Sequence, residues 1–201
     1  MKKTLVGVLL LSVFTLAACN SAKKTDTSSD AKQSSSKISK SNSQSKNEKD
    51  SSDFVKSASD ATFDGTTLKG NAYSIKITNH KIIQPGEKGN EYGKKLVIAF
   101  WYDTMVAPDY DNSDPIKPSS SWIMNFEVIQ DNDPNKVNKL KMAALPDDQF
   151  LRSQSAEIKP GGTVSNAVAY ELSDEKTPVT LIAKSFGKEF GKTTININQK
   201  D

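Results

Sequence analysis

The 201-residue sequence predicts an all-β domain, an antiparallel β-sandwich of about seven strands, that follows an apolar N-terminus and a polar linker. Three observations predict this fold class. Apolar and polar residues alternate in several short segments, a continuous apolar and aromatic run covers residues 96–102, and turn-forming residues separate these segments. No segment of the domain has a convincing helical periodicity, which also favours an all-β fold.

The first predicted strands have the clearest patterns. Tyr73, Ile75 and Ile77 alternate with polar residues, as in a strand with one buried face. Residues 96–102 (LVIAFWY) form a continuous apolar run, which indicates a central strand covered on both faces. Residues 122–130 (WIMNFEVIQ) predict a further strand. Its apolar face would carry Trp122, Met124, Phe126 and Val128.

The later strands are shorter and less regular. Residues 137–143 are a weaker strand candidate, and residues 146–155 are compatible with a helix or with a loop that starts at Pro146. The turn sequence KPGG at residues 159–162 precedes a strand with one apolar face. That face would consist of Val164, Val168, Tyr170 and Leu172. Residues 177–184 and 193–198 predict the last two strands.

The N-terminus has the pattern of a secretory signal peptide. Lys2 and Lys3 precede an uncharged apolar stretch at residues 4–16, and small residues follow directly before Cys19. The apolar stretch is shorter than the about 20 residues that a membrane-spanning helix needs. Residues 16–19 (LAAC) resemble the bacterial lipobox. This resemblance implies that a peptidase removes residues 1–18 and that a diacylglyceryl group is attached to the thiol of Cys19.

Cys19 is the only cysteine of the chain. If it were an ordinary, incidental cysteine, it would have to fall at the cleavage position by chance. We therefore expect a lipid on Cys19 that holds the protein at the extracellular face of the cell membrane, because two acyl chains give durable anchoring. A single cysteine also excludes an intrachain disulfide and a thiolate metal cage.

Residues 19–53 are predicted to form a lipidated, disordered linker between the signal peptide (residues 1–18) and the folded domain (residues 54–201). Residues 20–53 contain twelve Ser and seven Lys, and Ile38 is their only large apolar residue. This composition cannot bury enough apolar surface to offset its conformational entropy. As a coil the linker would span roughly 30–35 Å, and about 110 Å when extended. Binding of its lysines to anionic lipid or teichoic acid is the alternative, which the interspersed acidic residues disfavour.

The charge of the chain argues against a nucleic-acid partner. The formal net charge is +3, and loss of Lys2 and Lys3 with the signal peptide leaves +1 on the side chains. A nucleic-acid-binding domain usually has a basic stripe. Arg152 is the only arginine, although arginine is the usual residue for paired contacts with phosphate or guanine.

The order of these segments resembles a domain-of-unknown-function family of lipoproteins from lactobacilli, enterococci and streptococci. The resemblance covers roughly residues 71–198. It rests on residues 73–79, 96–103 (LVIAFWYD), 126–130, 158–161 (IKPG), 168–172 (VAYEL) and a final short strand. The sequence departs from the family at residues 102–104 (YDT), where a Thr-Asn-like end of the central strand is usual. The resemblance implies an immunoglobulin-like sandwich, distantly similar to a secreted mycobacterial antigen, but no activity.

The residues that usually carry catalysis or bind cofactors are scarce. His80 is the only histidine, and no serine lies in a nucleophile-elbow sequence that a Ser-His-Asp arrangement would need. We expect His80 to be a solvent-exposed residue at the end of a strand. A zinc site needs three or four His, Cys or carboxylate ligands, and no glycine-rich phosphate loop is present. We therefore predict no catalytic residue, no cofactor and no metal.

Residues 103–114 are the segment richest in potential calcium ligands. Asp103, Asp109, Asp111 and Asp114 offer the hard oxygen ligands that Ca²⁺ prefers. An EF-hand counted from Asp109 would need Gly and Glu at residues 114 and 120, where the sequence has Asp and Ser. A solvated acidic loop is therefore favoured, and a calcium site stays the alternative.

Residues 104–121 have no regular pattern and predict a long loop. Long loops at one end of a sandwich often form binding surfaces, and this loop carries Met105, Val106 and Tyr110 among polar residues. We propose it as a partner-contact site, with a mobile decoration as the alternative.

Two tryptophans allow two interpretations each, and one tyrosine is a candidate for a structural role. Trp101 and Trp122 have the ring type that stacks on sugars, but both lie in apolar patterns that favour core packing. Tyr170 is a candidate for the tyrosine corner of immunoglobulin sandwiches, which is a structural role.

Three functions are compatible with this sequence. The favoured one is a non-enzymatic, membrane-tethered module that binds a protein or a cell-wall polymer. The second is a structural or assembly role in the cell envelope. The third is a hydrolase that uses paired carboxylates such as Asp147 and Glu157, although nothing in the sequence positions such a pair.

Overall fold

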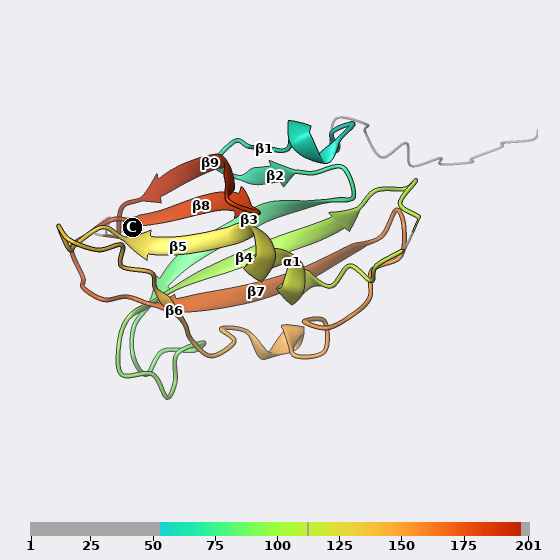
Figure 1. Cartoon of the computed structure of the whole chain (residues 1–201). Helices are drawn as coiled ribbons and strands as arrows, with labels where there is room; N and C mark the ends of the chain where they lie inside the picture. The colour runs from blue at the N-terminus through green and yellow to red at the C-terminus, as the bar shows by residue number, and fades with distance from the viewer. Residues whose placement is uncertain (1–52, 112, 198–201) are drawn as a thin grey trace, which may run out of the picture. The chain divides into compact units, whose positions relative to one another are not determined.

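A computed structural model describes residues 53–111 and 113–197, which form two antiparallel sheets packed as a sandwich (Figure 1). The described residues belong to one compact unit, residues 46–201. The predicted signal peptide, Cys19 and nearly all of the predicted linker lie outside the described residues. No helix among the described residues is long and apolar enough to cross a membrane.

The first sheet has the strand order β1-β2-β3-β4-β7-β6 and the second has the order β5-β8-β9. The strands of the described chain are β1 (Thr62–Phe63), β2 (Thr67–Lys69), β3 (Tyr73–Ile83), β4 (Val97–Val106), β5 (Phe126–Gln130), β6 (Lys141–Met142), β7 (Thr163–Glu171), β8 (Val179–Ser185) and β9 (Lys188–Ile195). One α-helix, α1 (Pro118–Asn125), lies between β4 and β5, and two 3₁₀ turns cover Ala58–Asp60 and Asp148–Phe150.

The topology is that of an immunoglobulin constant-type domain. Without β1 and β2, the first sheet has the order β3-β4-β7-β6, which matches the A-B-E-D sheet of such domains. The second sheet, β5-β8-β9, matches the C-F-G sheet. The prediction of an immunoglobulin-like antiparallel sandwich is therefore confirmed, and the β1–β2 hairpin is an addition to the edge of the first sheet.

β4 is covered on both faces, as its continuous apolar run predicts. Ile98, Phe100 and Tyr102 face the second sheet in the main core, while Val97 and Ala99 pack on the opposite face in a second cluster. All five are at most 2% exposed. Their burial on both sides makes β4 the central strand around which the domain is built.

The segment at residues 122–130 was wrongly predicted as one strand, because its first half is helical. Pro118 occupies the first turn of α1, where its fixed φ is favourable and its missing N–H has no consequence. The helix ends at Asn125, and the extended residue Phe126 starts β5. A helical turn buries Trp122 completely but exposes Met124, whereas a strand would place both on the same face.

The loop predicted at residues 104–121 is shorter than expected. β4 continues to Val106 and α1 starts at Pro118, so both ends of the predicted loop are regular structure. Met105 and Val106 are 8% and 0% exposed. Two of the three apolar residues proposed for partner contact are therefore core residues, and that proposal is wrong for them.

Other differences concern short elements. The hairpin of β1 and β2 was missed, because only Phe63 and Leu68 in it are buried apolar residues. β3 extends to Ile83 through a bulge between Ile77 and Asn79 that interrupts the alternation. Residues 146–155 contain only a 3₁₀ turn, and the weaker strand at residues 137–143 is reduced to β6 and one bridge at Lys139.

Candidate functional site

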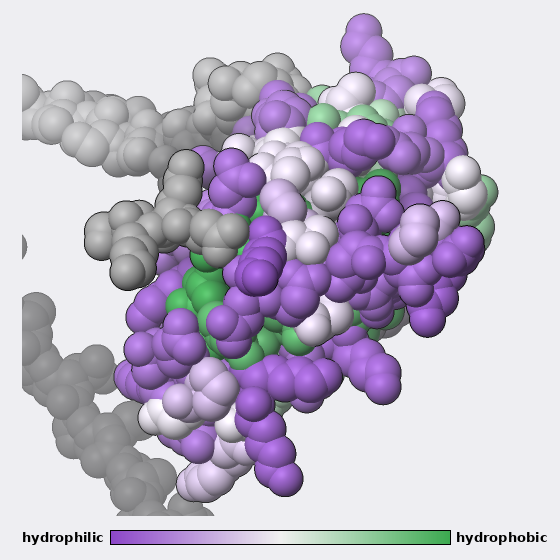
Figure 2. Space-filling model, turned by 90° about the vertical axis from the view of Figure 1, so that its left-hand side faces the viewer, coloured by the Kyte–Doolittle hydropathy of each residue, from purple (hydrophilic) through white to green (hydrophobic). Residues whose placement is uncertain are grey.

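Four exposed apolar side chains lie around the junction of α1 with the β8–β9 hairpin. Ile123, Met124, Met142 and Phe186 are 57%, 59%, 50% and 100% exposed. We call these four residues the apolar surface. Hydrophilic residues cover most of the face shown in Figure 2, and a smaller hydrophobic area lies among them.

Two hollows lie on either side of this junction. Ile123, Met124 and Met142 line one hollow of about 240 Å³ together with Lys184. The other hollow, of about 360 Å³, is lined by Phe186, Asn125 and Ser185. Asn125 directly follows Met124 in the chain, and Ser185 directly follows Lys184. Neighbouring residues of α1, and likewise of the hairpin, therefore line different hollows, so these two elements separate the hollows.

Phe186 is held in a backbone conformation that disfavours its side chain. Ser185 pairs with Lys188, so Phe186 and Gly187 form a two-residue hairpin loop, with φ of +47° and +81°. Positive φ at both positions is typical of turns made by Asn-Gly, and it is strained for a bulky residue. Because the Phe186 ring is fully exposed, the isolated chain gains no free energy from burial of the ring that would offset this backbone strain. Such strain occurs preferentially at functional sites.

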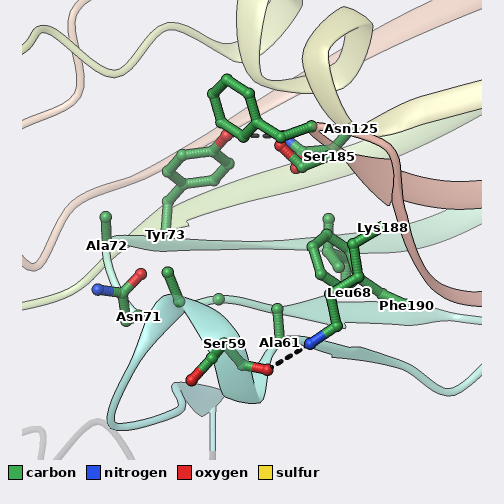
Figure 3. Close-up of a pocket in the computed structure, with 13 residues that line it drawn as sticks. Ser59, Ala61, Leu68, Asn71, Ala72, Tyr73, Asn125, Ser185, Lys188 and Phe190 are labelled. Carbon is green, nitrogen blue, oxygen red and sulfur yellow. Dashed lines mark hydrogen bonds between the residues drawn. The ribbon is translucent and has the colours of Figure 1, made fainter.

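The hollow beside Phe186 is mainly apolar (Figure 3). Its walls come from the 3₁₀ turn at Ala58–Asp60, from the turn between β2 and β3, and from the hairpin. Leu68 and Phe190 supply its larger apolar side chains, beside small residues such as Ala61 and Ala72. The hollow therefore has the space and the lining for an apolar side chain from outside the domain.

Two side-chain hydrogen bonds lie at the rim of this hollow. The Lys188 ammonium donates to the carbonyl oxygen of Ser59 at 2.7 Å, and the Asn125 side-chain amide donates to the hydroxyl of Tyr73 at 2.6 Å (Figure 3). Burial raises the pKa of Tyr73 above its usual value, so its hydroxyl stays neutral. Lys188 is the one charged residue in the lining. The hollow thus favours uncharged ligands.

The hollow beside Met124 has a more polar rim. The Glu127 carboxylate pairs with Lys139 and, at 2.9 Å, with Lys184. Desolvation acts to raise the pKa of Glu127, but the hydrogen bonds from both lysines hold it below the usual value. These ion pairs form a charged border beside the exposed Ile123 and Met124. An apolar centre with a polar border is the usual composition of a protein–protein interface.

A family model described as a domain of unknown function (DUF5067) matches residues 18–185. The chain belongs to this family. The predicted membership of a domain-of-unknown-function family is therefore confirmed, while the bacterial groups and the mycobacterial similarity stay predictions. A comparison of this DUF5067 chain with curated proteins found no match.

The DUF5067 chain is similar in fold to a solved structure from Staphylococcus aureus subsp. aureus NCTC 8325, described as a candidate lipoprotein. The two sequences are 23% identical, and the TM-score is 0.57. The match covers 69% of this chain and 93% of the staphylococcal chain. At this level of identity the comparison shows a shared fold.

The acidic segment of the DUF5067 domain does not gather into one site. Asp103 lies on β4 and accepts a hydrogen bond from the Ser165 hydroxyl at 2.5 Å. Asp111 accepts the backbone N–H of Ser113, which lowers the pKa of Asp111. Among residues 53–111 and 113–197, no group of three or more His, Cys, Asp or Glu is arranged to hold a metal ion.

The other residues singled out from the sequence are also separated. His80 lies within β3 rather than at a strand end, is exposed, and has its ring 6.4 Å from that of Phe100. Asp147 accepts hydrogen bonds from Gln149, whereas Glu157 pairs with Lys117 at 3.3 Å. The structure thus gives the carboxylates of the hydrolase hypothesis different partners.

Both tryptophans of the DUF5067 domain pack against the protein. Trp122 is fully buried, and Trp101 is half-buried against the second cluster, with its indole N–H 3.4 Å from the Asp147 carboxylate. Tyr170 is on β7, the equivalent of strand E, and its hydroxyl accepts from Trp122. A tyrosine corner lies at strand F and bonds to the backbone, so that interpretation of Tyr170 is wrong.

The sequence did not indicate the apolar surface. Ile123 and Met124 are exposed because the segment is helical, which its alternating pattern concealed. The signal for Phe186 was present: Phe186-Gly187 separates two alternating segments, and a glycine in a short loop indicates a hairpin turn.

Proposed function

We propose that this protein is a bacterial lipoprotein, anchored through Cys19 to the outer face of the cell membrane, whose DUF5067 domain binds another protein without catalysis. The binding site in this proposal is the apolar surface with its two hollows. A cell-wall polymer ligand and a role in envelope assembly are the alternatives.

The observation that carries the binding proposal is the exposed Phe186 at φ +47° beside an apolar hollow. The side chain contributes nothing to the core and its backbone is strained, so a partner that buries the ring is the simplest source of stabilisation. Full burial of a phenyl ring is worth about 1.5–3 kcal/mol. Exposed aromatic and methionine side chains are typical anchors of protein interfaces.

The anchoring proposal is supported by the N-terminal sequence and by the comparisons. The family model starts at residue 18, next to the predicted cleavage site. The staphylococcal protein with a similar fold is described as a candidate lipoprotein. We expect Cys19→Ser to release the protein from the membrane fraction and to block processing of residues 1–18. Unchanged fractionation and processing would contradict the anchoring proposal.

Affinity capture with crosslinking tests the binding proposal. The bait is the lipidated protein on intact cells, compared with Phe186→Asn, which the turn tolerates well. The matched control is Tyr92→Asn, because Tyr92 is 98% exposed but lies outside both hollows. We expect a protein partner that the Phe186 variant loses and the Tyr92 variant keeps.

The identity of the captured material separates the alternatives. A single co-purifying membrane protein would favour envelope assembly, whereas capture of a wall polymer by both variants would contradict binding through the apolar surface. Detection of turnover that a carboxylate-to-amide substitution abolishes would contradict the non-enzymatic proposal.

A further inference from the structure

We propose that a third hollow, between β3 and β9, binds an extended segment of a protein partner, which adds a strand to the uncovered edge of β3. This hollow has a volume of about 600 Å³ and shares no lining residue with the two hollows of the apolar surface. The inference therefore goes beyond the proposed function and does not depend on Phe186.

β2 covers only the first part of the β3 edge. The backbone bond between them that lies furthest along β3 runs from the N–H of Ile77 to the carbonyl oxygen of Thr66, at 2.9 Å. β3 continues to Ile83, and of the described strands only β4 pairs with it there. The backbone groups of residues 78–82 that point away from β4 therefore have no backbone partner within the described chain. An edge of this kind is a template for a further strand.

The end of β9 forms the opposite wall of the hollow. β9 is the last strand of its sheet and pairs with β8 alone. Residues 193–196 line the hollow, and so do residues 77–80 of β3 and the turn between β1 and β2. Two strand edges, one from each sheet, therefore border the same hollow. Another extended backbone matches such edges, because a strand repeats its donors and acceptors every two residues. A saccharide has no such repeat.

The hollow is an opening in the side of the sandwich. His80 pairs with Phe100 and Thr193 pairs with Leu181, and cross-strand partners lie on the same face of a sheet. Phe100 and Leu181 belong to the main core, so His80 and Thr193 lie on the inner faces of their sheets. His80 is nevertheless exposed, with its ring 6.4 Å from that of Phe100. The space beside His80 is thus open to a strand from outside.

Six hydroxyl and amide side chains line this hollow without a hydrogen-bond partner in residues 53–111 and 113–197. They are Thr66, Thr78, Asn79, Thr193, Thr194 and Asn196. No Asp, Glu, Lys or Arg of the described chain belongs to the lining. Because burial of an unpaired charge is costly, we infer that the centre of the bound segment is uncharged. Hydroxyl and amide side chains of that segment would find free donors and acceptors here.

The charges around the hollow favour acidic ends on the bound segment. The charged residues that directly adjoin a lining residue in the chain are Asp64, Lys76, Lys81 and Lys192. The three lysines are exposed, and none forms an ion pair within the part of the chain that the structure describes. These residues leave an excess of two positive charges. Carboxylates at the ends of the segment would be attracted, and salt would weaken this part of the binding.

NMR titration with a synthetic peptide tests this inference. The protein is the chain from residue 19 onward with Cys19→Ser, which keeps the whole compact unit of residues 46–201. The probe is the blocked peptide ETVTVTE, which has β-branched residues, an uncharged centre and acidic ends. The control peptide ETVPVTE lacks the central backbone N–H. We expect ETVTVTE at about 1 mM to shift the amide signals of residues 78–82 and 193–196. It should also slow hydrogen exchange along the β3 edge, and ETVPVTE should have neither effect.

A pair of protein variants locates the binding. Thr194→Asp places a negative charge at the hollow, opposite the acidic ends of the peptide, and should weaken binding of ETVTVTE about tenfold. Thr62→Asp is the matched control, because Thr62 is also exposed on an edge strand but lies outside the lining. It should change the binding by less than about twofold. Equal weakening by both variants would contradict binding in this hollow.

Three further results would overturn the inference. The first is the absence of shifts with millimolar ETVTVTE, or equal shifts with both peptides. The second is shifts at residues 78–82 that grow with protein concentration alone, because they would indicate a second copy at this edge. The third is the same shifts with the neutral saccharide chitotriose and none with ETVTVTE. Each of these failures leaves the capture experiment intact, since it depends on Phe186 and not on the β3 edge.

Discussion

The indole N–H of Trp122 donates to the hydroxyl of Tyr170 at 2.8 Å inside the main core. Trp122 is fully buried and Tyr170 is 5% exposed, so water cannot replace either partner. The bond connects α1, which leads into β5 of the second sheet, to β7 of the first sheet. Around this bond, the centroid of the Trp122 ring lies 4.5 Å from the ring centroid of Tyr102 and 4.4 Å from that of Phe126. The bond therefore holds the helix that exposes Ile123 and Met124 against the core.

Tyr170→Phe should lower the free energy of unfolding by about 1–3 kcal/mol, because it leaves a buried N–H without an acceptor. Urea denaturation at neutral pH measures this change. The control is Tyr92→Phe at a 98% exposed position, which should change stability by less than about 0.5 kcal/mol. Equal stabilities of the two variants would show that the Trp122–Tyr170 bond contributes nothing.

Phe186→Asn should stabilise the isolated domain by about 1 kcal/mol, because Asn followed by Gly187 suits positive φ at both loop positions. The same substitution should abolish partner capture. Phe186→Ala is the matched control, since Ala keeps the backbone strain while it also removes the ring. If Phe186→Asn is less stable than the parent chain, Phe186 must contribute contacts that its full exposure does not indicate.

Gly191→Ala should destabilise the domain by about 2 kcal/mol or more. A Cβ at this position would overlap the carbonyl oxygen of Phe63 on β1, and the φ of +151° is unfavourable for any residue with a side chain. Gly86→Ala is the control, because its φ is also positive, +84°, but its Cβ would meet no atom within 4 Å. Thermal or urea unfolding should show a clearly smaller loss for Gly86→Ala. A similar loss for both would mean that β1 and β9 separate easily.

The stability of the domain should fall below about pH 4, in part through Asp174. The backbone N–H of Thr177, the Asn132 amide and the backbone N–H of Lys176 bond to its carboxylate and hold the pKa of Asp174 far below the usual value. The unfolded chain has a pKa of about 3.9 at this residue, so the folded state binds fewer protons. This stabilisation is complete above the unfolded value and is lost as the pH falls.

Asp174→Asn tests this pH dependence. The variant should be less stable than the parent chain at pH 7, and the difference should shrink at pH 3, as measured by urea denaturation at both values. Glu175→Gln removes a neighbouring, exposed carboxylate and serves as the control. A difference between parent and Asp174→Asn that is the same at both pH values would contradict this role of the carboxylate.

The sandwich was predictable because its longest strands have unambiguous patterns. The apolar run in β4 indicated burial on both faces, and Ile98 and Val97 do lie in clusters on opposite faces. The KPGG turn preceded β7 as expected. Short elements were less predictable, since β1 and β2 have two and three residues and each contains a single buried apolar side chain.

The candidate site was not predictable in the same way. Trp122 and Met124 are two residues apart, so they suit a strand face by pattern alone. The segment is helical because Trp122 then reaches the core between Tyr102 and Phe126, which only the packed sheets provide. The earlier proposal at residues 104–121 failed for the same reason, because β4 extends wherever β3 and β7 pair with it.

The sequence by itself determined the fold class, the predicted lipid anchor at Cys19 and the scarcity of catalytic groups, because these depend on composition and on local patterns. Only the tertiary structure decided which apolar side chains stay exposed. Exposure depends on what the opposite sheet and the neighbouring loops cover, and residues distant in sequence provide that cover. Phe186 and Met124 are apolar in the sequence like any core residue, and they became candidate contacts only because the folded chain leaves them uncovered.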